Sequence, residues 1–411
     1  MKHKHFGTDG IRGRVGEKIT REFVERVAIA ATKYVGASVA RPKCSQTICI
    51  GHDTRSSCAW IVDIFERTLR SAGIRVVNVG VVPTAGLSFL TVANGASLGI
   101  MITASHNPAE YNGIKFFDKK GRKVGERGIR KLEKLIDLSL CRGGNLPPVA
   151  TMHENCPWEN YLVEKFKPIF DKFCNKPKIV VDCANGSGAH VAEQVLTRLG
   201  FDFELVNNTP NGTNINDGCG AVHPDPKYGY CLDGDADRLV IPNVHGDRLI
   251  AALAVWLKCK RIVTTILFNS GVERFLKEKG IDVIRTDVGD RHIANALARR
   301  KVSPSFGGET SGHLIFPDVW HGGDGLVAIL VTLHMVCDTG KTIRELTENI
   351  PLFPSVSTNI AGTTLPDIAT LQKENPDYRI IVRASGTEPL VRIIVEGDCF
   401  EKCKKLMNEI N

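Results

Sequence analysis

Short apolar runs alternate with amphipathic stretches along most of the chain. Ile48–Ile50 and Arg75–Val79 are typical of buried strands, whereas Phe23–Val35 has the spacing of an amphipathic helix. A second helix face is marked by four apolar residues at helical spacing, Ile129, Leu132, Leu135 and Ile136. The alternation predicts an α/β fold.

The same order of elements repeats further along the chain. A strand at Lys178–Asp182 is followed by a helix that ends at Leu199. The next repeat has strands at Arg261–Phe268 and Asp282–Arg285 and helices at Val272–Lys279 and Arg291–Arg299. Such alternation favours mostly parallel sheets, whose ligands bind beyond the carboxyl ends of the strands.

The C-terminal part departs from this order. Two strands, Tyr378–Val382 and Leu390–Val395, flank a tight loop, and Phe400–Ile410 reads as a closing helix. Cys141–Pro148 is rich in glycine and proline, which indicates a linker between domains.

Composition narrows the classes of function. The 411 residues are 43% hydrophobic and 24% charged, as in ordinary globular proteins. No apolar run approaches the ~20 residues that span a bilayer, and the N-terminus lacks the apolar core of a secretory signal. We therefore expect a cytoplasmic protein with no membrane contact. The net charge of +8 is scattered rather than clustered with aromatics, which favours small anionic substrates over nucleic acid.

The cysteines are numerous but irregularly spaced. There are 13 of them and no Cys-x-x-Cys pair. Several, such as Cys49, Cys183 and Cys231, lie within apolar segments, so we expect buried free thiols rather than disulfides or zinc ligands.

The segment Thr103–Pro108 places a serine at the end of the apolar run Leu98–Ile102. Asn-Pro stops the strand and forces a turn, so the Ser105 hydroxyl can reach into a cleft and carry a phosphoryl group. A turn serine that bonds only its own backbone is the alternative. Adjacent residues of an extended segment point to opposite faces, so we expect His106 to be poorly placed to deprotonate Ser105.

Three aspartates occupy every second position of a short segment, Asp233, Asp235 and Asp237, and Gly234 between the first two allows a tight bend. Carboxylates this close repel one another unless a cation lies among them, and hard oxygen ligands suit Mg²⁺. A calcium EF-hand loop is excluded, because its sixth position would be Arg238 and its twelfth Val244. A solvated acidic turn remains the alternative.

Three further features carry polar groups of the right kind. Lys115 follows Ser105 closely enough to share its cleft, either as a proton acceptor with a lowered pKa or as a phosphate counter-charge. The loop Gly307–His313 offers a carboxylate and a hydroxyl suited to sugar hydroxyls, and too few ligands for zinc. Arg383–Pro389, together with Arg392, reads as a phosphate cradle.

With these motifs in order, the chain resembles the α-D-phosphohexomutase family, most closely its bacterial phosphoglucosamine mutase branch. The resemblance spans the whole chain and rests on Phe6–Gly13, Thr103–Pro108 with Asn112–Phe117, Asp233–Arg238, Gly308–His313 and Arg383–Arg392. It implies four domains: three similar α/β domains at residues 1–148, 149–246 and 247–346, and a smaller α+β domain at 347–411.

The resemblance also implies roles for individual residues. Ser105 would be the phosphoserine, and its phosphate would join Asp233, Asp235 and Asp237 around one Mg²⁺ per subunit. Arg12 and Lys115 would flank the transfer, with His106 as a further catalytic candidate. The substrate would be bound by Arg238, Glu309, Ser311, His313, Arg383, Ser385, Gly386, Thr387 and Arg392.

The implied reaction interconverts glucosamine 6-phosphate and glucosamine 1-phosphate through a 1,6-bisphosphate, with a glucosamine or glucose bisphosphate as primer and a monomer or homodimer as the working form. Phosphoglucomutase or phosphomannomutase activity, a non-catalytic phosphosugar-binding protein and a Mg²⁺-dependent phosphatase are the alternatives. The chain departs from the branch's usual residues at His52, Ala236 and Asp287, and only twelve residues separate Gly220 from Asp233.

Overall fold

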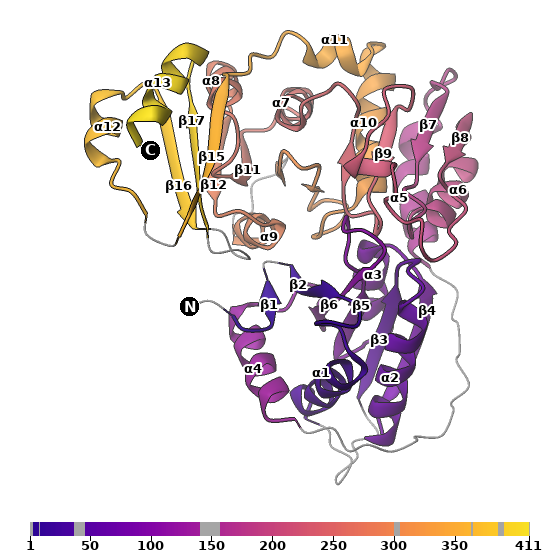
Figure 1. Cartoon of the computed structure of the whole chain (residues 1–411). Coiled ribbons are helices and arrows are strands. Elements are labelled where there is room, and N and C mark those ends of the chain that lie inside the picture. The colour runs from indigo at the N-terminus through magenta and orange to yellow at the C-terminus, as the bar shows by residue number, and fades with distance from the viewer. Residues whose placement is uncertain are drawn as a thin grey trace. The chain divides into compact units, whose positions relative to one another are not determined.

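The computed structural model describes residues 3–7, 9–36, 46–139, 157–299, 305–362, 365–384 and 390–410. The chain divides into two compact units (Figure 1). Unit 1 consists of His3–Asn243 and Ser311–Asp338, and unit 2 of Val244–Thr310 and Thr339–Asn411.

Unit 1 contains a six-stranded sheet in the order β1-β2-β6-β5-β3-β4. Its strands are β1 (Phe6–Gly7), β2 (Gly10–Arg14), β3 (Thr47–His52), β4 (Arg75–Val81), β5 (Leu98–Ile102) and β6 (Tyr111–Asp118). β3 pairs parallel with β4 and β5, while β5, β6, β2 and β1 pair antiparallel. The accompanying helices are α1 (Arg21–Tyr34), α2 (Cys58–Ser71), α3 (Thr84–Ala93) and α4 (Glu126–Asp137).

Both faces of this sheet are covered. Ile48 and Ile50 of β3 belong to the core formed with α1, α2 and α4, whereas Cys49 between them belongs to the core formed with α3. Successive strand residues point to opposite faces, so one short apolar run serves two cores. The carboxyl end of β5 is thereby fixed from both sides, and the turn that contains Ser105 starts just after it.

The second sheet of unit 1 has the order β10-β9-β7-β8. Its strands are β7 (Ile179–Asp182), β8 (Phe203–Val206), β9 (Tyr230–Leu232) and β10 (Leu239–Val240). β7 pairs parallel with β8 and β9, and β9 pairs antiparallel with β10. The unit also contains α5 (Trp158–Phe170), α6 (Ala189–Arg198), the 3₁₀ turn η1 (Gly220–Val222), β14 (Leu314–Ile315) and α10 (Gly325–Thr339).

Unit 2 begins with a parallel arrangement in which β11 pairs with β12 and β13. These elements are β11 (Arg261–Thr265), β12 (Asp282–Thr286) and β13 (Ser305–Gly308), with helices α7 (Gly246–Trp256), α8 (Ser270–Glu278), α9 (Asp290–Arg299) and α11 (Ile343–Thr347).

An antiparallel sheet in the order β15-β17-β16 completes unit 2. Its elements are β15 (Ser355–Ala361), β16 (Arg379–Ala384) and β17 (Leu390–Glu396), and α12 (Ala369–Glu374) and α13 (Phe400–Ile410) accompany them.

The α/β class predicted from the alternation of elements is confirmed, and most elements lie where the pattern placed them. One expected strand is shorter: β11 ends at Thr265 instead of Phe268. Asn269 caps α8 by accepting hydrogen bonds from the amides of Gly271 and Val272, and this cap requires the chain to turn just beforehand. The four domain boundaries remain a prediction. The expected linker at Cys141–Pro148 lies outside the described residues.

The described cysteines form no disulfide. Seven of them are buried, including Cys49, Cys183 and Cys231. Burial raises the pKa of Cys231 to about 12, so this thiol is inert rather than reactive. Over the described ranges, no helix combines the length and apolar character needed to cross a membrane.

The amphipathic face of α4 provides a test of the first core. Leu132 is fully buried, whereas Leu138 at the helix C-terminus is 62% exposed. We expect Leu132→Ala to lower the free energy of unfolding by about 2–5 kcal/mol, because it leaves a cavity. Leu138→Ala, the matched control, should change it by less than about 0.5 kcal/mol. Urea denaturation followed by circular dichroism measures both, and equal losses would contradict this packing.

Candidate active site

The Ser105 turn places a buried hydroxyl directly against the aspartate loop. Ser105 is fully buried and its backbone is left-handed, with φ of +52°. Its amide donates to Thr103 Oγ1 at 2.8 Å, and its own Oγ donates to Asp233 Oδ2 at 2.6 Å. The serine thus faces an acidic group that lies 128 residues away in the chain.

The aspartate loop connects β9 to β10. Asp233, Asp235 and Asp237 are buried, and each offers a carboxylate oxygen within 4.8 Å of the others. Ala236 adopts a left-handed φ of +54°, which curls the loop so that all three side chains converge. Burial, together with repulsion from Asp237 and Asp235, raises the pKa of Asp233 to about 7.

These residues fit a divalent cation. Asp235 Oδ1 and Asp237 Oδ1 are buried and accept no hydrogen bond from any described residue. Buried carboxylate oxygens are costly without a partner, and Mg²⁺ takes oxygen ligands of this kind while keeping positions for phosphate oxygens. The solvated acidic turn considered from the sequence is wrong, because all three side chains are buried.

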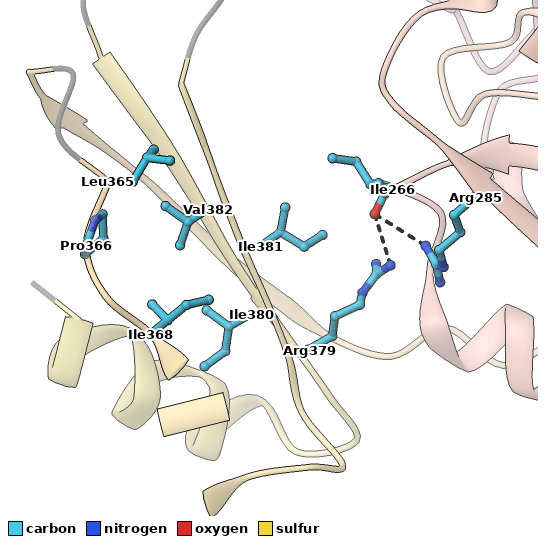
Figure 2. Close-up of a pocket in the computed structure, with 9 residues that line it drawn as sticks. All are labelled: Ile266, Arg285, Leu365, Pro366, Ile368, Arg379, Ile380, Ile381 and Val382. Atoms are coloured by element: carbon cyan, nitrogen blue, oxygen red, sulfur yellow. Dashed lines mark hydrogen bonds between the residues drawn. The ribbon is translucent and has the colours of Figure 1, made fainter. Parts of the chain in front are cut away.

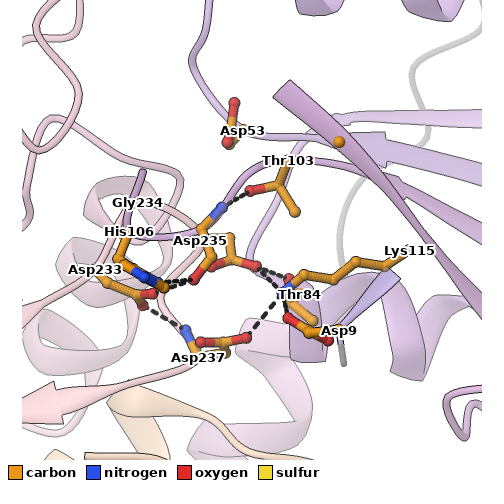
Figure 3. Close-up of polar contacts among 12 residues, drawn as sticks. Asp9, Asp53, Thr84, Thr103, His106, Lys115, Asp233, Gly234, Asp235 and Asp237 are labelled. Carbon is orange, nitrogen blue, oxygen red and sulfur yellow. Dashed lines mark hydrogen bonds and ion pairs between the residues drawn. The ribbon is translucent and has the colours of Figure 1, made fainter. Parts of the chain in front are cut away.

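Lys115 projects from β6 into the same group of carboxylates. Its Nζ lies 2.7 Å from Asp235 Oδ2, 3.0 Å from Asp237 Oδ2 and 2.9 Å from Asp9 Oδ2 (Figure 3). Burial alone would lower the pKa of Lys115, but the three carboxylates outweigh it and raise that pKa well above its usual value. The condition for a lysine base, a lowered pKa, is therefore not met among these carboxylates.

Asp9 is a site residue that the sequence analysis did not single out. It binds Arg12 Nη2 at 2.6 Å and Lys115 Nζ at 2.9 Å, and it also pairs with Lys123. Burial tends to raise the pKa of Asp9, yet Lys115, Lys123 and Arg12 hold it well below its usual range. Its position three residues before Arg12 on the β1–β2 hairpin was the available signal.

Arg12 and Arg238 add positive charge around the serine. Arg12 also donates to Asn107 Oδ1 at 3.4 Å, beside the Ser105 turn. Arg238 Nε lies 3.9 Å from both Asp233 Oδ2 and Asp237 Oδ1. Each guanidinium is thus near enough to the carboxylates to balance their charge and to attract an anion.

The expected orientation of His106 is wrong. Because Ser105 is left-handed rather than extended, the imidazole does not point to the opposite face, and Nδ1 lies 3.5 Å from Ser105 Oγ. Burial, then the charges of Arg238 and Arg12, lower the pKa of His106 to about 4. The ring is therefore neutral near pH 7.

The loop Gly307–His313, which we expected to bind sugar hydroxyls, is divided between the two units after Thr310. In unit 2, Glu309 Oε1 accepts from the amide of Gly289 at 2.9 Å. In unit 1, Ser311 is exposed, while His313 is 3% exposed with Nε2 3.3 Å from Asp237 Oδ2. Burial tends to raise the pKa of Asp237, but His313 and Lys115 outweigh it and hold that pKa well below its usual range.

The expected phosphate cradle is partly described. Arg383 and Arg392 are directly opposite in the β16–β17 pair. Burial and the neighbouring Arg392 charge lower the pKa of Arg383. Two guanidiniums side by side repel each other, and an anion between them relieves that repulsion. The other members of the cradle, Ser385, Gly386 and Thr387, lie outside the described residues.

Unit 2 also contains a pocket of about 490 Å³ on the edge strand β16 (Figure 2). Arg285 and Arg379 both donate to the carbonyl of Ile266 there. Glu273 pairs with the first arginine and Glu396 with the second. Their charges are already compensated, so the pocket carries no specific attraction for an anion.

Comparisons with known proteins converge on one family. The chain matches the phosphoglucomutase/phosphomannomutase α/β/α domain I at residues 3–139, domain III at 245–353 and the C-terminal domain at 354–411. It is 37% identical to the phosphoglucosamine mutase of Paracidovorax citrulli, over 100% of this chain and 98% of the relative. Identity to that of Nautilia profundicola is 34%, over 98% and 97%.

Solved structures share the fold. A phosphoglucomutase/phosphomannomutase family protein from Burkholderia thailandensis aligns with a TM-score of 0.75 at 22% identity, over 98% of this chain and 95% of that one. The N-acetylphosphoglucosamine mutase of Aspergillus fumigatus, solved with GlcNAc-6P and magnesium, aligns with a TM-score of 0.70 at 19% identity, over 100% and 95%.

The raised pKa of Asp233 predicts how Mg²⁺ binding depends on pH. Below its pKa of about 7 this carboxyl is protonated, and the proton competes with the cation. We expect the Mg²⁺ dissociation constant of EDTA-treated protein to be about tenfold higher at pH 6 than at pH 8, which means weaker binding at pH 6. Isothermal titration calorimetry at both pH values measures it.

The matched variants are Asp233→Asn and Asp225→Asn. The first should bind Mg²⁺ weakly at either pH, whereas the second removes an exposed carboxylate and should retain the pH dependence. Equal affinity of the unmodified protein at pH 6 and pH 8 would show that Asp233 is not a ligand.

Proposed function

This chain belongs to the phosphoglucomutase/phosphomannomutase family, and on that premise we propose that it is a phosphoglucosamine mutase. It would interconvert D-glucosamine 6-phosphate and α-D-glucosamine 1-phosphate, feeding the synthesis of UDP-N-acetylglucosamine and cell-wall precursors in the cytoplasm. The relatives that match nearly its full length carry this name. Their names favour glucosamine phosphate over glucose or mannose phosphate as the substrate of this chain.

One observation carries the proposal. The Ser105 hydroxyl lies 2.6 Å from the buried carboxylate of Asp233. In the same triad, Asp235 Oδ1 and Asp237 Oδ1 accept no hydrogen bond from any described residue. The neighbouring His106 imidazole, with a pKa of about 4, is too weak a base to activate this serine as the nucleophile of a Ser–His hydrolase. A phosphoserine, in contrast, would find cations on one side and a metal-binding triad on the other.

In the proposed cycle, phosphorylated Ser105 transfers its phosphoryl group to a sugar hydroxyl. The bond between phosphorus and Ser105 Oγ breaks as the bond to the sugar oxygen forms, and the proton of the sugar hydroxyl passes to the released Ser105 Oγ. The product is the 1,6-bisphosphate. After the bisphosphate has reoriented in the site, its other phosphoryl group returns to Ser105 Oγ. A glucosamine or glucose 1,6-bisphosphate would prime the unphosphorylated serine.

Charge neutralisation is the main requirement of this chemistry. Asp233, Asp235 and Asp237, with a phosphoserine oxygen, would hold one Mg²⁺ per subunit, which supplies positive charge at the transferring group. Lys115 is the proposed acid/base, and its carboxylate partners keep the proton on Nζ, so the acid form is the resting one. His106 can hydrogen-bond the serine oxygen without adding charge.

Substrate recognition is assigned to two further groups. Glu309, Ser311 and His313 would bind sugar hydroxyls, although the contact between His313 and Asp237 also gives that ring a role beside the triad. Arg238 would hold the reacting phosphate. The non-reacting phosphate would be bound by Arg383, Ser385, Gly386, Thr387 and Arg392, and the repulsion between the two opposed guanidiniums supports this assignment.

A coupled assay tests the substrate. With Mg²⁺ and a trace of sugar bisphosphate, we expect kcat/KM for glucosamine 6-phosphate to exceed that for glucose or mannose 6-phosphate by at least about tenfold. A preference for mannose or glucose would assign the chain to another branch of the family. Release of inorganic phosphate without isomerised product would instead indicate a phosphatase. A monomer or homodimer is the proposed working form.

Ser105→Ala tests the phosphoryl carrier. Removing the only atom that accepts the group should lower kcat by at least about 10³-fold, while affinity for glucosamine 6-phosphate changes little. Ser71→Ala is the control, because that hydroxyl bonds a helix carbonyl in α2. Mass spectrometry of protein incubated with the bisphosphate should find the phosphoryl group on Ser105 and none on the alanine variant. Normal turnover by Ser105→Ala would refute the mechanism.

A further inference from the structure

The backbone of Ser105 needs external support. Residues with a side chain rarely adopt a φ of +52°, and such conformations persist only where the surroundings impose them. The hydrogen bond from its amide to Thr103 Oγ1 is local and leaves the carbonyls of the turn to be satisfied elsewhere. These carbonyls must therefore accept hydrogen bonds from donors elsewhere in the chain.

Arg55 holds several of them at once. Its side chain is fully buried just after β3. Nη2 donates to the carbonyls of Ser105 at 2.9 Å and Asn107 at 2.7 Å, and Nη1 donates to those of Pro108 and Tyr111. Nε completes the set by donating to a carboxylate.

That carboxylate belongs to Asp53, at 3.0 Å, and it too is fully buried. The amide of Asp53 donates to the carbonyl of Ile102 at the end of β5. All five N–H groups of the Arg55 guanidinium are thus used, and its charge is balanced by an anchored neighbour. Lysine has three N–H groups on a single atom and cannot reproduce this fork.

Asn216, in the loop between β8 and η1, holds the same turn. Its Nδ2 donates to the carbonyl of Ser105 at 2.9 Å and to that of Asn107 at 3.1 Å. Its own amide donates to the carbonyl of Ala184, which fixes its position. The two carbonyls are therefore each held by two donors from separate parts of the unit.

We propose that Arg55 and Asn216 are positioning residues that clamp the Ser105 turn in its left-handed conformation, independently of the phosphorylation state of the serine. All the clamp's bonds to the turn go to main-chain carbonyls, and none goes to Ser105 Oγ. A group that gains and loses a phosphoryl in every cycle needs its backbone fixed by contacts that this chemistry does not touch. This inference deepens the proposed function and rests on it.

The clamp predicts a specific kinetic defect. Arg55→Lys keeps the charge but loses the fork, and Asn216→Asp replaces the donating amide with an acceptor that faces two carbonyls. For each variant of the full chain we expect kcat with glucosamine 6-phosphate to fall about 10²-fold, because the serine is displaced, while KM changes by less than about threefold. Hydrogen exchange measured by mass spectrometry should be at least about tenfold faster in the peptide that covers Thr103–Asn107.

Two substitutions of the same chemistry serve as controls. Asn214→Asp also removes an amide donor from the same loop, but its partner is the carbonyl of Thr209. Arg26→Lys removes a fork that binds the carbonyl of Ile136, away from the turn. Neither control should alter kcat or the exchange of the turn by more than about threefold.

Several outcomes would overturn the proposal. Unchanged kcat and exchange in Asn216→Asp would do so, and so would equal defects in the controls or a loss that merely follows a lowered melting temperature. Should Arg55→Lys fail to fold, Asn216→Asp decides alone. If the unmodified protein isomerises no hexose phosphate, the proposed function fails, whereas the exchange comparison still decides whether the clamp exists.

Discussion

The mutual repulsion of buried carboxylates is the constraint around which unit 1 is organised. Three carboxylate oxygens within 4.8 Å of one another, all removed from water, are unstable without cations. The chain supplies Lys115 from the centre of the first sheet and holds it there with Asp9 from the N-terminal hairpin. Strand order, the hairpin and the curled loop after β9 therefore have one common purpose, which is to bring opposite charges together at the carboxyl end of β5.

The balance of charge in this cluster explains why phosphoserine and Mg²⁺ belong together. Four acidic and four basic side chains lie around the serine, namely Asp9, Asp233, Asp235, Asp237, Arg12, Lys115, Lys123 and Arg238. A phosphoserine adds about −1.5 to −2 charges and a magnesium ion adds +2, so the pair enters without upsetting the balance. Either one alone would leave a buried excess of charge in the cluster.

The sequence was most informative where chemistry is carried by side chains in short motifs. The union of Ser105 with the aspartates could be expected, because both follow strands at the carboxyl edge of their sheets. Asp9 and Arg55 escaped notice since their importance depends on which distant groups they meet. The predicted orientation of His106 was wrong for the same reason. It depends on the left-handed φ of Ser105, which tertiary contacts impose on a non-glycine residue and which no local sequence pattern indicates. Residues 385–387 can still be assigned only from their motif.

Two kinds of contact thus act on one serine, and they are separated by the atoms that they touch. Charged groups surround the Oγ, where electrostatics must respond as the phosphoryl group comes and goes. The backbone is held instead by a guanidinium whose charge Asp53 cancels and by the neutral amide of Asn216. Because this second set carries no net charge, it is largely insensitive to changes at the hydroxyl. A reusable phosphoryl carrier requires this separation, since a turn held through its own reacting oxygen would loosen at each transfer.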